Sequence, residues 1–281
     1  MADPFQRYRG LEIAADSPRA AETAAVRHHG VGDLALTERS TAATFAQLAH
    51  SAIDDAVARG VVPIVSGGTG LYLRAAIARM SFPADTDPAV RAWAESLVAR
   101  DPAAARAALS DRDPEAAARI DAANPRRLAR ALEIAADPAP RSPGDGLWSG
   151  EVRRPTLLVG LTRPREELDR RIALRVRREL DEGLLDELEA ALDTPGVSRE
   201  ALQVIGAREV LAMRSGELAA EDLAERLAAR TRRLARRQLT WLRKTPRIVP
   251  LDLGDRPAED ALPSLLALWR GPEPDRVPLR G

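Results

Sequence analysis

The segment 45–77 restricts the possible fold more than any other part of the sequence. Residues 45–58 place apolar side chains on one helical stripe before Gly60, as in an amphipathic helix that ends at a glycine. The run VVPIVS at 61–66 is short, apolar and rich in β-branched residues, and it predicts a buried parallel strand. GGTG at 67–70 then turns the chain into the next helical sequence. The order helix, strand, glycine turn, helix predicts a doubly wound α/β sheet.

Two later apolar runs extend the predicted sheet. TLLVGL at 156–161 precedes a helix predicted from about Pro164 to Glu182, and RIVPL at 247–251 is the third predicted strand. Segment 136–155 is rich in proline and glycine and predicts a surface loop. Residues after Arg270 predict a polar tail.

Residues 82–122 differ from this pattern because they contain no β-type run. Asp101-Pro102 and Asp113-Pro114 each precede alanine-rich sequence, and an aspartate cap followed by proline is a common helix start. We therefore predict an α/β catalytic core over 1–80 and 123–281, with a helical insertion over 81–122.

The composition excludes several classes of protein. The chain has no cysteine, which excludes disulfides and thiolate metal sites. It has no apolar run of transmembrane length and no apolar core of a signal peptide near Met1. We expect a cytoplasmic protein that does not enter a membrane and acts as a monomer.

The charge is distributed unevenly, although the formal net charge is +0. Between Arg226 and Lys244 the sequence holds arginines at helical spacing and no acid, opposite a stripe of leucines. Such a helix suits a phosphate backbone, so we favour binding of nucleic acid or another polyphosphate. The alternative is a solvated helix face, but acids usually alternate with bases on such a face.

Three further motifs are ambiguous when each is taken alone. GGTG favours an anion at the start of the following helix, but it also suits a plain tight turn. Arg171, Arg175 and Arg178 lie on one predicted helix face, where they could hold a pyrophosphate or face solvent. NPRRLARALEI at 124–134 predicts a capped basic helix.

Taken together and in order, these pieces resemble one family, the tRNA dimethylallyltransferases, also called tRNA isopentenylpyrophosphate transferases. The resemblance runs from Asp3 to about Leu251. The motifs that carry it are DPFQRYRGLEI (3–13), RHHGV (27–31), GGTGLYLRA (67–75), DPAVR (87–91), NPRRLARALEI (124–134), RIALRVRRELDEGLLDEL (171–188), QVIGAREVL (203–211) and TRRLARRQLTWLR (231–243).

The resemblance implies a fold, a reaction and a site. The fold is a P-loop-type nucleotide-binding α/β domain with a helical insertion. The reaction transfers a dimethylallyl group from its pyrophosphate to the exocyclic amine of the adenosine beside the anticodon, with Mg²⁺ bridging the pyrophosphate oxygens. The partner is the anticodon stem-loop of tRNA, from which the adenosine is extruded, because a stacked base cannot present its amine to a buried electrophile.

The same resemblance assigns roles to residues. It implies that Asp3 is the general base, that Thr69 hydrogen-bonds within the reacting centre, and that Arg175 with Arg171 holds the pyrophosphate. No protein residue is implied as a metal ligand. The implied tRNA contacts are Asp3, Pro4, Phe5, Gln6, Thr69, Arg91, Arg126, Arg127, Leu128, Ala129, Arg130, Gln203, Val204, Ile205, Gly206, Ala207, Arg208, Arg233, Arg236, Arg237, Gln238, Leu239, Thr240, Trp241, Leu242 and Arg243.

One part of the family pattern is missing from this sequence. The family opens with a strand and a glycine-rich phosphate loop that ends in a lysine, whereas Lys244 is the only lysine here and no such loop precedes it. We expect the coding region to extend upstream of Met1. The alternatives are a non-catalytic tRNA-binding remnant and an enzyme that prenylates free adenine nucleotides. The latter would need neither the basic helix nor the insertion.

Overall fold

The computed structural model divides the chain into two compact units, Met1–Met80 with Asp145–Gly281 and Ser81–Gly144. It describes residues 1–80, 82, 87–121, 123–136 and 150–271. Most of the predicted loop at 136–155 and nearly all of the predicted tail after Arg270 therefore lie outside the described residues. The first unit shares 1–80 and 145–281 with the predicted α/β core, and the second contains the predicted insertion together with residues 123–144.

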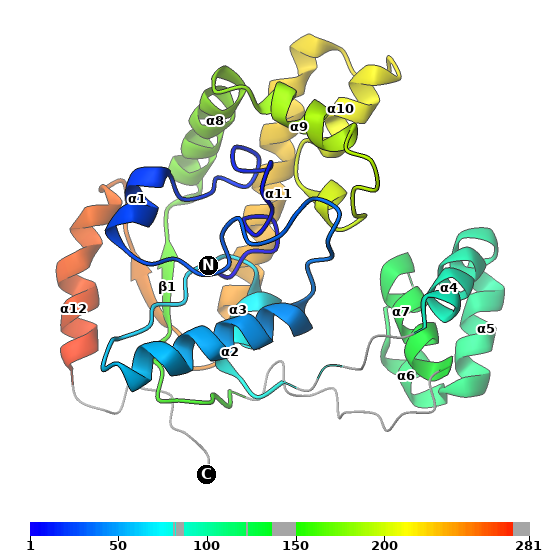
Figure 1. Ribbon diagram of the computed structural model, residues 1–281, viewed down its shortest axis with the longest axis horizontal. Helices are drawn as coiled ribbons and strands as arrows, with labels where there is room; N and C mark the ends of the chain where they lie inside the picture. Colours follow the sequence, from blue (N-terminus) through cyan, green and yellow to red (C-terminus); the bar gives the residue numbers. More distant parts are fainter. Residues whose placement is uncertain (81, 83–86, 122, 137–149, 272–281) are drawn as a thin grey trace. The chain divides into compact units, whose positions relative to one another are not determined.

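The first unit combines helices with a small parallel sheet (Figure 1). Strand β1 (Val159–Thr162) pairs in parallel with β2 (Val249–Asp252), in the register Val159 to Val249. The helices of this unit are α1 (Ala20–Ala25), α2 (Ala42–Ala58), α3 (Gly70–Ile77), α8 (Arg165–Asp181), α9 (Leu184–Leu192), α10 (Ala207–Arg214), α11 (Leu223–Lys244) and α12 (Leu262–Arg270). Short 3-10 turns lie at Ala201–Gln203, Ala220–Asp222 and Ala258–Ala261.

The predicted strand at 61–66 does not form in the described part of the chain. The segment is not hydrogen-bonded into the sheet, although its last carbonyl, Ser66 O, accepts from the Ala2 amide at 2.7 Å. Val61, Val62 and Ile64 are exposed by 54%, 52% and 88%. The prediction was wrong because a strand must hydrogen-bond to a neighbouring strand, and in the described part of the chain β1 and β2 pair with each other and not with this segment.

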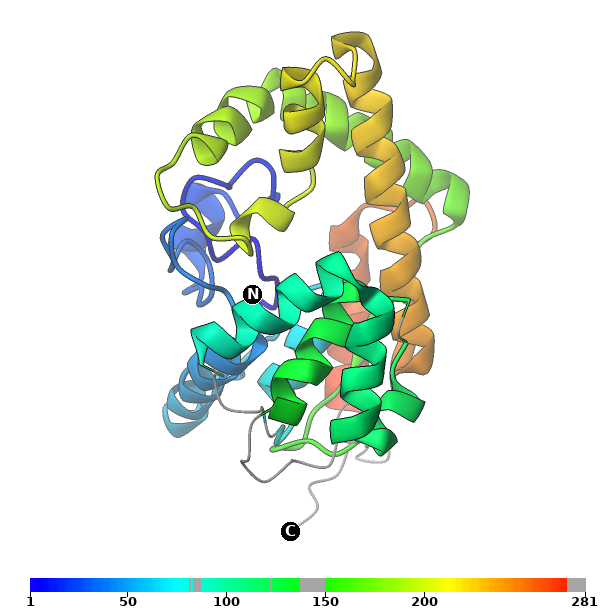
Figure 2. The ribbon, with the colours of Figure 1, turned by 90° about the vertical axis from the view of Figure 1, so that its right-hand side faces the viewer.

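The core of the first unit lies among α8, α9, α10 and α11 together with the N-terminal segment. Tyr8 and Leu11 are buried beside Val176 of α8, Leu188 of α9 and Leu227 of α11. Figure 2 shows α11 as the long yellow-to-orange helix of this unit. The predicted apolar stripe of this helix is therefore confirmed, and it ties the DPFQRYRG motif to the basic helix.

The second unit is a cluster of short helices: α4 (Pro88–Arg100), α5 (Pro102–Arg112), α6 (Pro114–Arg119) and α7 (Pro125–Ala136). The predicted aspartate caps are present, since Asp101 Oδ1 accepts from the Ala103 and Ala104 amides at 3.0 and 2.9 Å. Asp113 caps α6 in the same way. Helix α7 shares a core with α4 and α5 through Leu128 and Leu132, so the helical unit extends past the expected boundary at 122.

Candidate active site

Asp3 is held by hydrogen bonds from its own N-terminal segment and from the GGTG turn. Its Oδ1 accepts from the Phe5 amide at 2.8 Å, and its Oδ2 accepts from the Thr69 hydroxyl at 3.3 Å. The first bond is local, whereas the second joins residues 66 positions apart. The structure therefore brings together the aspartate and the threonine that the resemblance places in one reacting centre.

The surroundings of Asp3 make its carboxylate a stronger base. Burial raises the pKa of Asp3, while bonds from the Phe5 and Gln6 amides and from Thr69 oppose that rise, as does the charge of Arg175. A carboxyl group whose pKa is raised toward neutrality accepts a proton more readily, as a general base requires. Arg175 lies near enough for its charge to act on Asp3.

Thr69 owes its orientation to the turn before α3. It occupies the N-cap position of α3, but its side chain makes no capping bond. A threonine at this position normally accepts a hydrogen bond from an amide in the first turn of the helix. In this fold the Thr69 hydroxyl donates to Asp3 instead.

Arg175 and Arg178 of α8 are paired with carboxylates. Arg175 donates from Nε to Glu179 at 2.6 Å, and its Nη1 lies 3.1 Å from Asp16 Oδ2. Arg178 also contacts Asp16, at 2.7 Å. Burial raises the pKa of Glu179, which Arg175 partly offsets. Two carboxylates therefore fix two edges of the Arg175 guanidinium.

Arg171 lies on the same helix but has a different partner. It contacts Glu167 at 2.6 Å, and Arg170 contacts that carboxylate at 2.8 Å. Their hydrogen bonds lower the pKa of Glu167 to about 2. Arg171 does not contact Asp3 or Thr69, so the structure brings only Arg175 of this pair close to Asp3.

Asp16 and Glu179 are two partners of Arg175 that the sequence motifs did not identify. Glu179 lies four residues after Arg175, a spacing at which helical side chains meet, so the sequence carried a signal for it. Asp16 carried none, because it comes from a distant turn in which its φ is 48°. The side-chain amide of Gln6 donates from Nε2 to the Asp16 carbonyl at 2.9 Å and helps to hold that turn.

The basic helix α11 changes character along its length. Arg230 pairs with the buried Glu209 at 2.7 Å, and Arg232 pairs with Glu225 at 3.0 Å. Beyond Arg232, no arginine of α11 has a carboxylate within 4.0 Å in the described part of the chain, and the exposed ones are Arg233, Arg236, Arg237 and Arg243.

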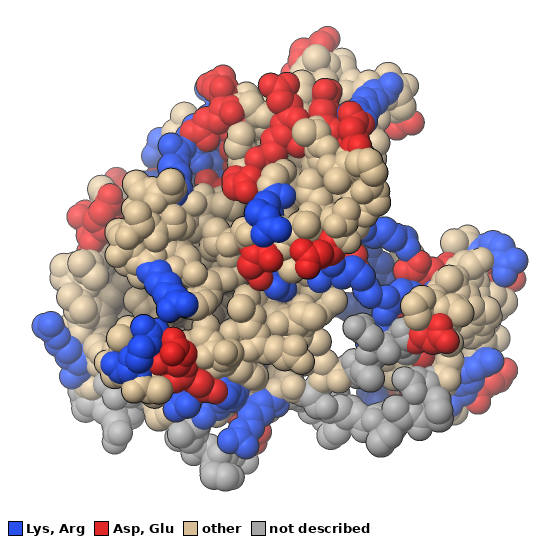
Figure 3. Space-filling view, viewed as in Figure 1, with Lys and Arg blue, Asp and Glu red and all other residues tan. Residues whose placement is uncertain are grey.

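The acids of the first unit lie elsewhere. Figure 3 shows red side chains gathered over the part of this unit formed by α8, α9 and α10, among the blue ones. Arg171, Arg175 and Arg178 of α8 contact carboxylates there, whereas the C-terminal half of α11 keeps its positive charge uncompensated by any acid of the described residues.

Comparison with known proteins agrees with this geometry. The family model described as IPP transferase matches residues 6–245. The chain belongs to the IPP transferase family. This match spans the Thr69 turn, both arginine-bearing helices and the helical unit.

Individual relatives of this IPP transferase are similar over nearly its whole length. It is 39% identical to the tRNA dimethylallyltransferase of Kineococcus radiotolerans, over 92% of this chain and 84% of that protein. It is 39% identical to the tRNA dimethylallyltransferase of Thermobifida fusca, over 90% of this chain and 80% of that protein.

Solved structures give the same result. The tRNA isopentenylpyrophosphate transferase of Bacillus halodurans matches with a TM-score of 0.65 and 30% identity, over 94% of this chain and 84% of that one. A eukaryotic dimethylallyltransferase acting on tRNA matches with a TM-score of 0.70 and 26% identity, over 95% and 70%. The expected α/β fold with a helical insertion is therefore confirmed.

Burial separates the predicted RNA-contact residues of this transferase into two groups. Leu128, Ala129, Val204 and Ala207 are at most 8% exposed and form core contacts, so their side chains have little surface to offer RNA. Arg126, Arg127 and Arg208 are exposed. The motifs at 124–134 and 203–211 thus combine core residues with exposed arginines.

Arg91 and Arg130 have a structural role in the helical unit. Arg91 donates to Glu133 at 2.9 Å and Arg130 donates to it at 2.6 Å. Glu133 is 4% exposed, and a carboxylate at that depth needs cationic partners. A contact of these two arginines with RNA stays a prediction from the resemblance.

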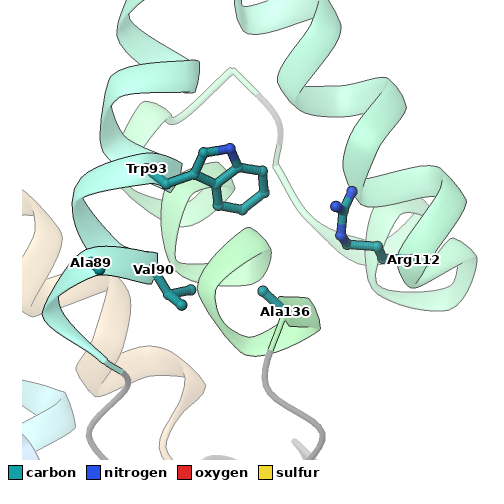
Figure 4. Close-up of a pocket in the computed structure, with 5 residues that line it drawn as sticks. All are labelled: Ala89, Val90, Trp93, Arg112 and Ala136. Atoms are coloured by element: carbon teal, nitrogen blue, oxygen red, sulfur yellow. The ribbon is translucent and has the colours of Figure 1, made fainter.

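A pocket of about 320 Å³ opens in the helical unit (Figure 4). Ala89, Val90, Trp93, Arg112 and Ala136 line it, with the Arg112 guanidinium 5.3 Å from the centre of the Trp93 ring. It offers no carboxylate, imidazole or hydroxyl for acid–base chemistry, so it is not the reacting centre.

The described residues contain no group of three or more His, Cys, Asp or Glu side chains placed to hold a metal. No helix among them is long and apolar enough to cross a membrane.

Proposed function

We propose that this chain transfers a dimethylallyl group from dimethylallyl pyrophosphate to the exocyclic amine of the adenosine adjacent to the tRNA anticodon. The hydrogen bond between Thr69 and the partly buried carboxylate of Asp3, with Arg175 close by, carries this proposal. Membership of the IPP transferase family and the names of the relatives support it.

The residues present suit the steps of such a transfer. The amine nitrogen attacks the allylic carbon, the carbon–oxygen bond breaks, and pyrophosphate leaves with the electron pair. Asp3 accepts the proton that the amine loses, which helps because the amine of an aromatic base is a weak nucleophile. Arg175 stabilises the negative charge that builds on the departing pyrophosphate.

Magnesium fits this scheme as an ion bound together with the pyrophosphate substrate. A resident all-protein site does not fit the described residues, but Mg²⁺ commonly binds through substrate phosphates with one or two protein oxygens. We therefore propose that Mg²⁺ would be held mainly by the pyrophosphate of the substrate and would help to neutralise the charge of the leaving group.

The RNA-binding surface that we propose is the exposed C-terminal half of α11. Its uncompensated arginines suit an anticodon stem-loop and are superfluous for a free adenine nucleotide. Nothing in the fold or the relatives favours the free-nucleotide enzyme or a binding-only remnant.

The test is the variant Asp3→Asn, assayed for prenylation of an anticodon stem-loop. Loss of general base catalysis should lower turnover by about 10²–10⁴-fold, while RNA affinity stays within a few-fold. Asp186→Asn, which changes an exposed carboxylate of α9, is the matched control and should leave turnover unchanged.

The pH dependence gives a second readout of the same variant. Because burial raises the pKa of Asp3, turnover should increase as the pH rises through that pKa and then level off. Asp3→Asn should lose this rising limb. The buried charge disfavours folding above that pKa, so the variant should melt no lower than the parent at neutral pH. Weaker RNA binding at unchanged turnover would show that Asp3 is not the base.

A further inference from the structure

Two glycines of the GGTG turn are pressed against side chains of α11. A Cβ atom built on Gly68 would lie 2.1 Å from Nε2 of Gln238, and one built on Gly70 would lie 2.0 Å from the ring of Trp241. Neither glycine has a φ in the left-handed region. Position 70 therefore requires glycine for space and not for backbone conformation, whereas at position 68 the flexible end of Gln238 would have to move aside for a side chain.

The residues that press on the turn share one face of α11. Gln238, Trp241 and Leu242 are partly buried, and Leu242 similarly occupies the space over Gly160 of β1. The exposed arginines of the same stretch, Arg233, Arg236 and Arg237, lie at helical positions on another face. The same helix thus carries exposed cations on one side and the contacts to the Thr69 turn on the other.

Thr69 depends on this support because its hydroxyl does not anchor its own helix. A threonine at an N-cap position usually fixes the turn by accepting a bond from a helix amide, and that bond is absent here. The hydroxyl instead reaches Asp3 across 3.3 Å. The flanking glycines have no side chains of their own with which to hold the turn, so neighbouring groups must do so.

We propose that Gln238 and Trp241 are positioning residues that seat the GGTG turn and thereby aim the Thr69 hydroxyl at Asp3. RNA phosphates bound to the exposed arginines would fix the position of α11. The opposite face of the helix, which carries Gln238 and Trp241, would then fix the position of the GGTG turn. The family resemblance by itself assigns Gln238 and Trp241 to direct RNA contact. This inference rests on the proposed function and gives α11 a second role in it.

The test is a pair of double-mutant cycles with prenylation turnover and RNA affinity as readouts. Gly70→Ala should lower turnover by about tenfold or more, because the Trp241 ring is rigid and a misplacement of about 1 Å can cost about 100-fold. In a Trp241→Leu background the same change should cost less than about threefold, because the clash is reduced. Gly68→Ala with Gln238→Ala should show the same pattern with a smaller cost, because the end of Gln238 can move aside.

RNA affinity separates positioning from direct contact. Gln238→Ala should lower turnover several-fold while the Kd for the stem-loop and its salt dependence stay within about twofold of the parent. Asp186→Asn, which changes an exposed carboxylate of α9 outside the proposed site, is the control and should change neither.

Two outcomes would overturn the inference. One is an equal cost of Gly70→Ala with and without Trp241, which would mean that the glycine serves another purpose, such as close approach of a substrate. The other is a loss of affinity in Gln238→Ala, which would make it an RNA contact. Absence of prenylation by the parent chain would instead count against the proposed function, and melting temperatures would still report whether each glycine is coupled to its α11 partner.

Discussion

Helices α8 and α11 look alike in sequence and differ in the structure. Each has leucine, isoleucine or valine on one face and a row of arginines on another. On α8, Arg171, Arg175 and Arg178 all contact carboxylates. On α11, the arginines beyond Arg232 have no carboxylate partner in the described part of the chain.

The difference follows from where the acids lie. Helix α8 contains its own acids one turn from its arginines, at Glu167 and Glu179, and the turn at Asp16 adds another. Helix α11 contains no acid after Glu225. Paired arginines are held in one geometry, which suits a reacting centre, whereas unpaired arginines remain available to a phosphate chain.

The sharpest test of this difference is Arg175→Ala. If the paired arginine of α8 stabilises the leaving pyrophosphate, turnover should fall by about 10²–10³-fold, as when one preorganised donor is removed from a charged transition state. RNA affinity should not change. Arg177→Ala, an exposed arginine of the same helix, is the matched control. Similar decreases in turnover in both variants would show that Arg175 contributes no more to the reaction than an exposed arginine of the same helix.

The second test addresses the exposed C-terminal half of α11, where the arginines have no carboxylate partner in the described part of the chain. Replacing Arg233, Arg236 and Arg237 together by Ala should weaken stem-loop binding by about tenfold or more. The slope of log affinity against log salt concentration should become shallower by about 0.7–0.9 for each phosphate that is no longer bound. The melting temperature should stay the same, because these side chains are exposed and have no carboxylate partner among the described residues.

Arg226→Ala is the matched control for that triple variant, since Arg226 is exposed on the same helix and lies seven residues before Arg233. It should change the salt dependence little. If the triple variant kept its full affinity and salt dependence, α11 would be a solvated surface and RNA would bind elsewhere.

The smallest expected effect concerns Arg230, the paired arginine of α11. Arg230→Ala leaves the 5% exposed carboxylate of Glu209 without its cation, which should lower the free energy of unfolding by about 1–2 kcal/mol. Denaturant unfolding measures this decrease. Arg230→Ala combined with Glu209→Gln should recover part of it. Unchanged stability with weaker RNA binding would show that Arg230 acts as an RNA contact, like the exposed arginines beyond Arg232.

Local signals in the sequence predict most of the helices. The aspartate caps at 101 and 113, the helix from about 164 to 182 and the long basic helix are confirmed, because caps and helical periodicity involve residues close in the chain. The strands predicted at 156–161 and 247–251 are also confirmed to within a few residues.

The error at 61–66 and the omission of Asp16 both involve partners distant in sequence. The run at 61–66 has the composition of a buried strand, but burial depends on strands that its own sequence cannot specify. The contact of Asp16 with Arg175 joins a distant turn to a helix and leaves no periodic signal. Glycines at 68 and 70 suggest room for a ligand in the sequence, whereas the structure places side chains of α11 there.

The exposed segment at 61–65 has a consequence for how this protein behaves in concentrated solution. An extended apolar stretch with an open edge can template pairing with another chain and start aggregation. Pro63 lies at the centre of this stretch and has no amide hydrogen to donate. Intermolecular β-pairing along this edge would therefore lack a hydrogen bond at its midpoint, which disfavours self-association through this stretch.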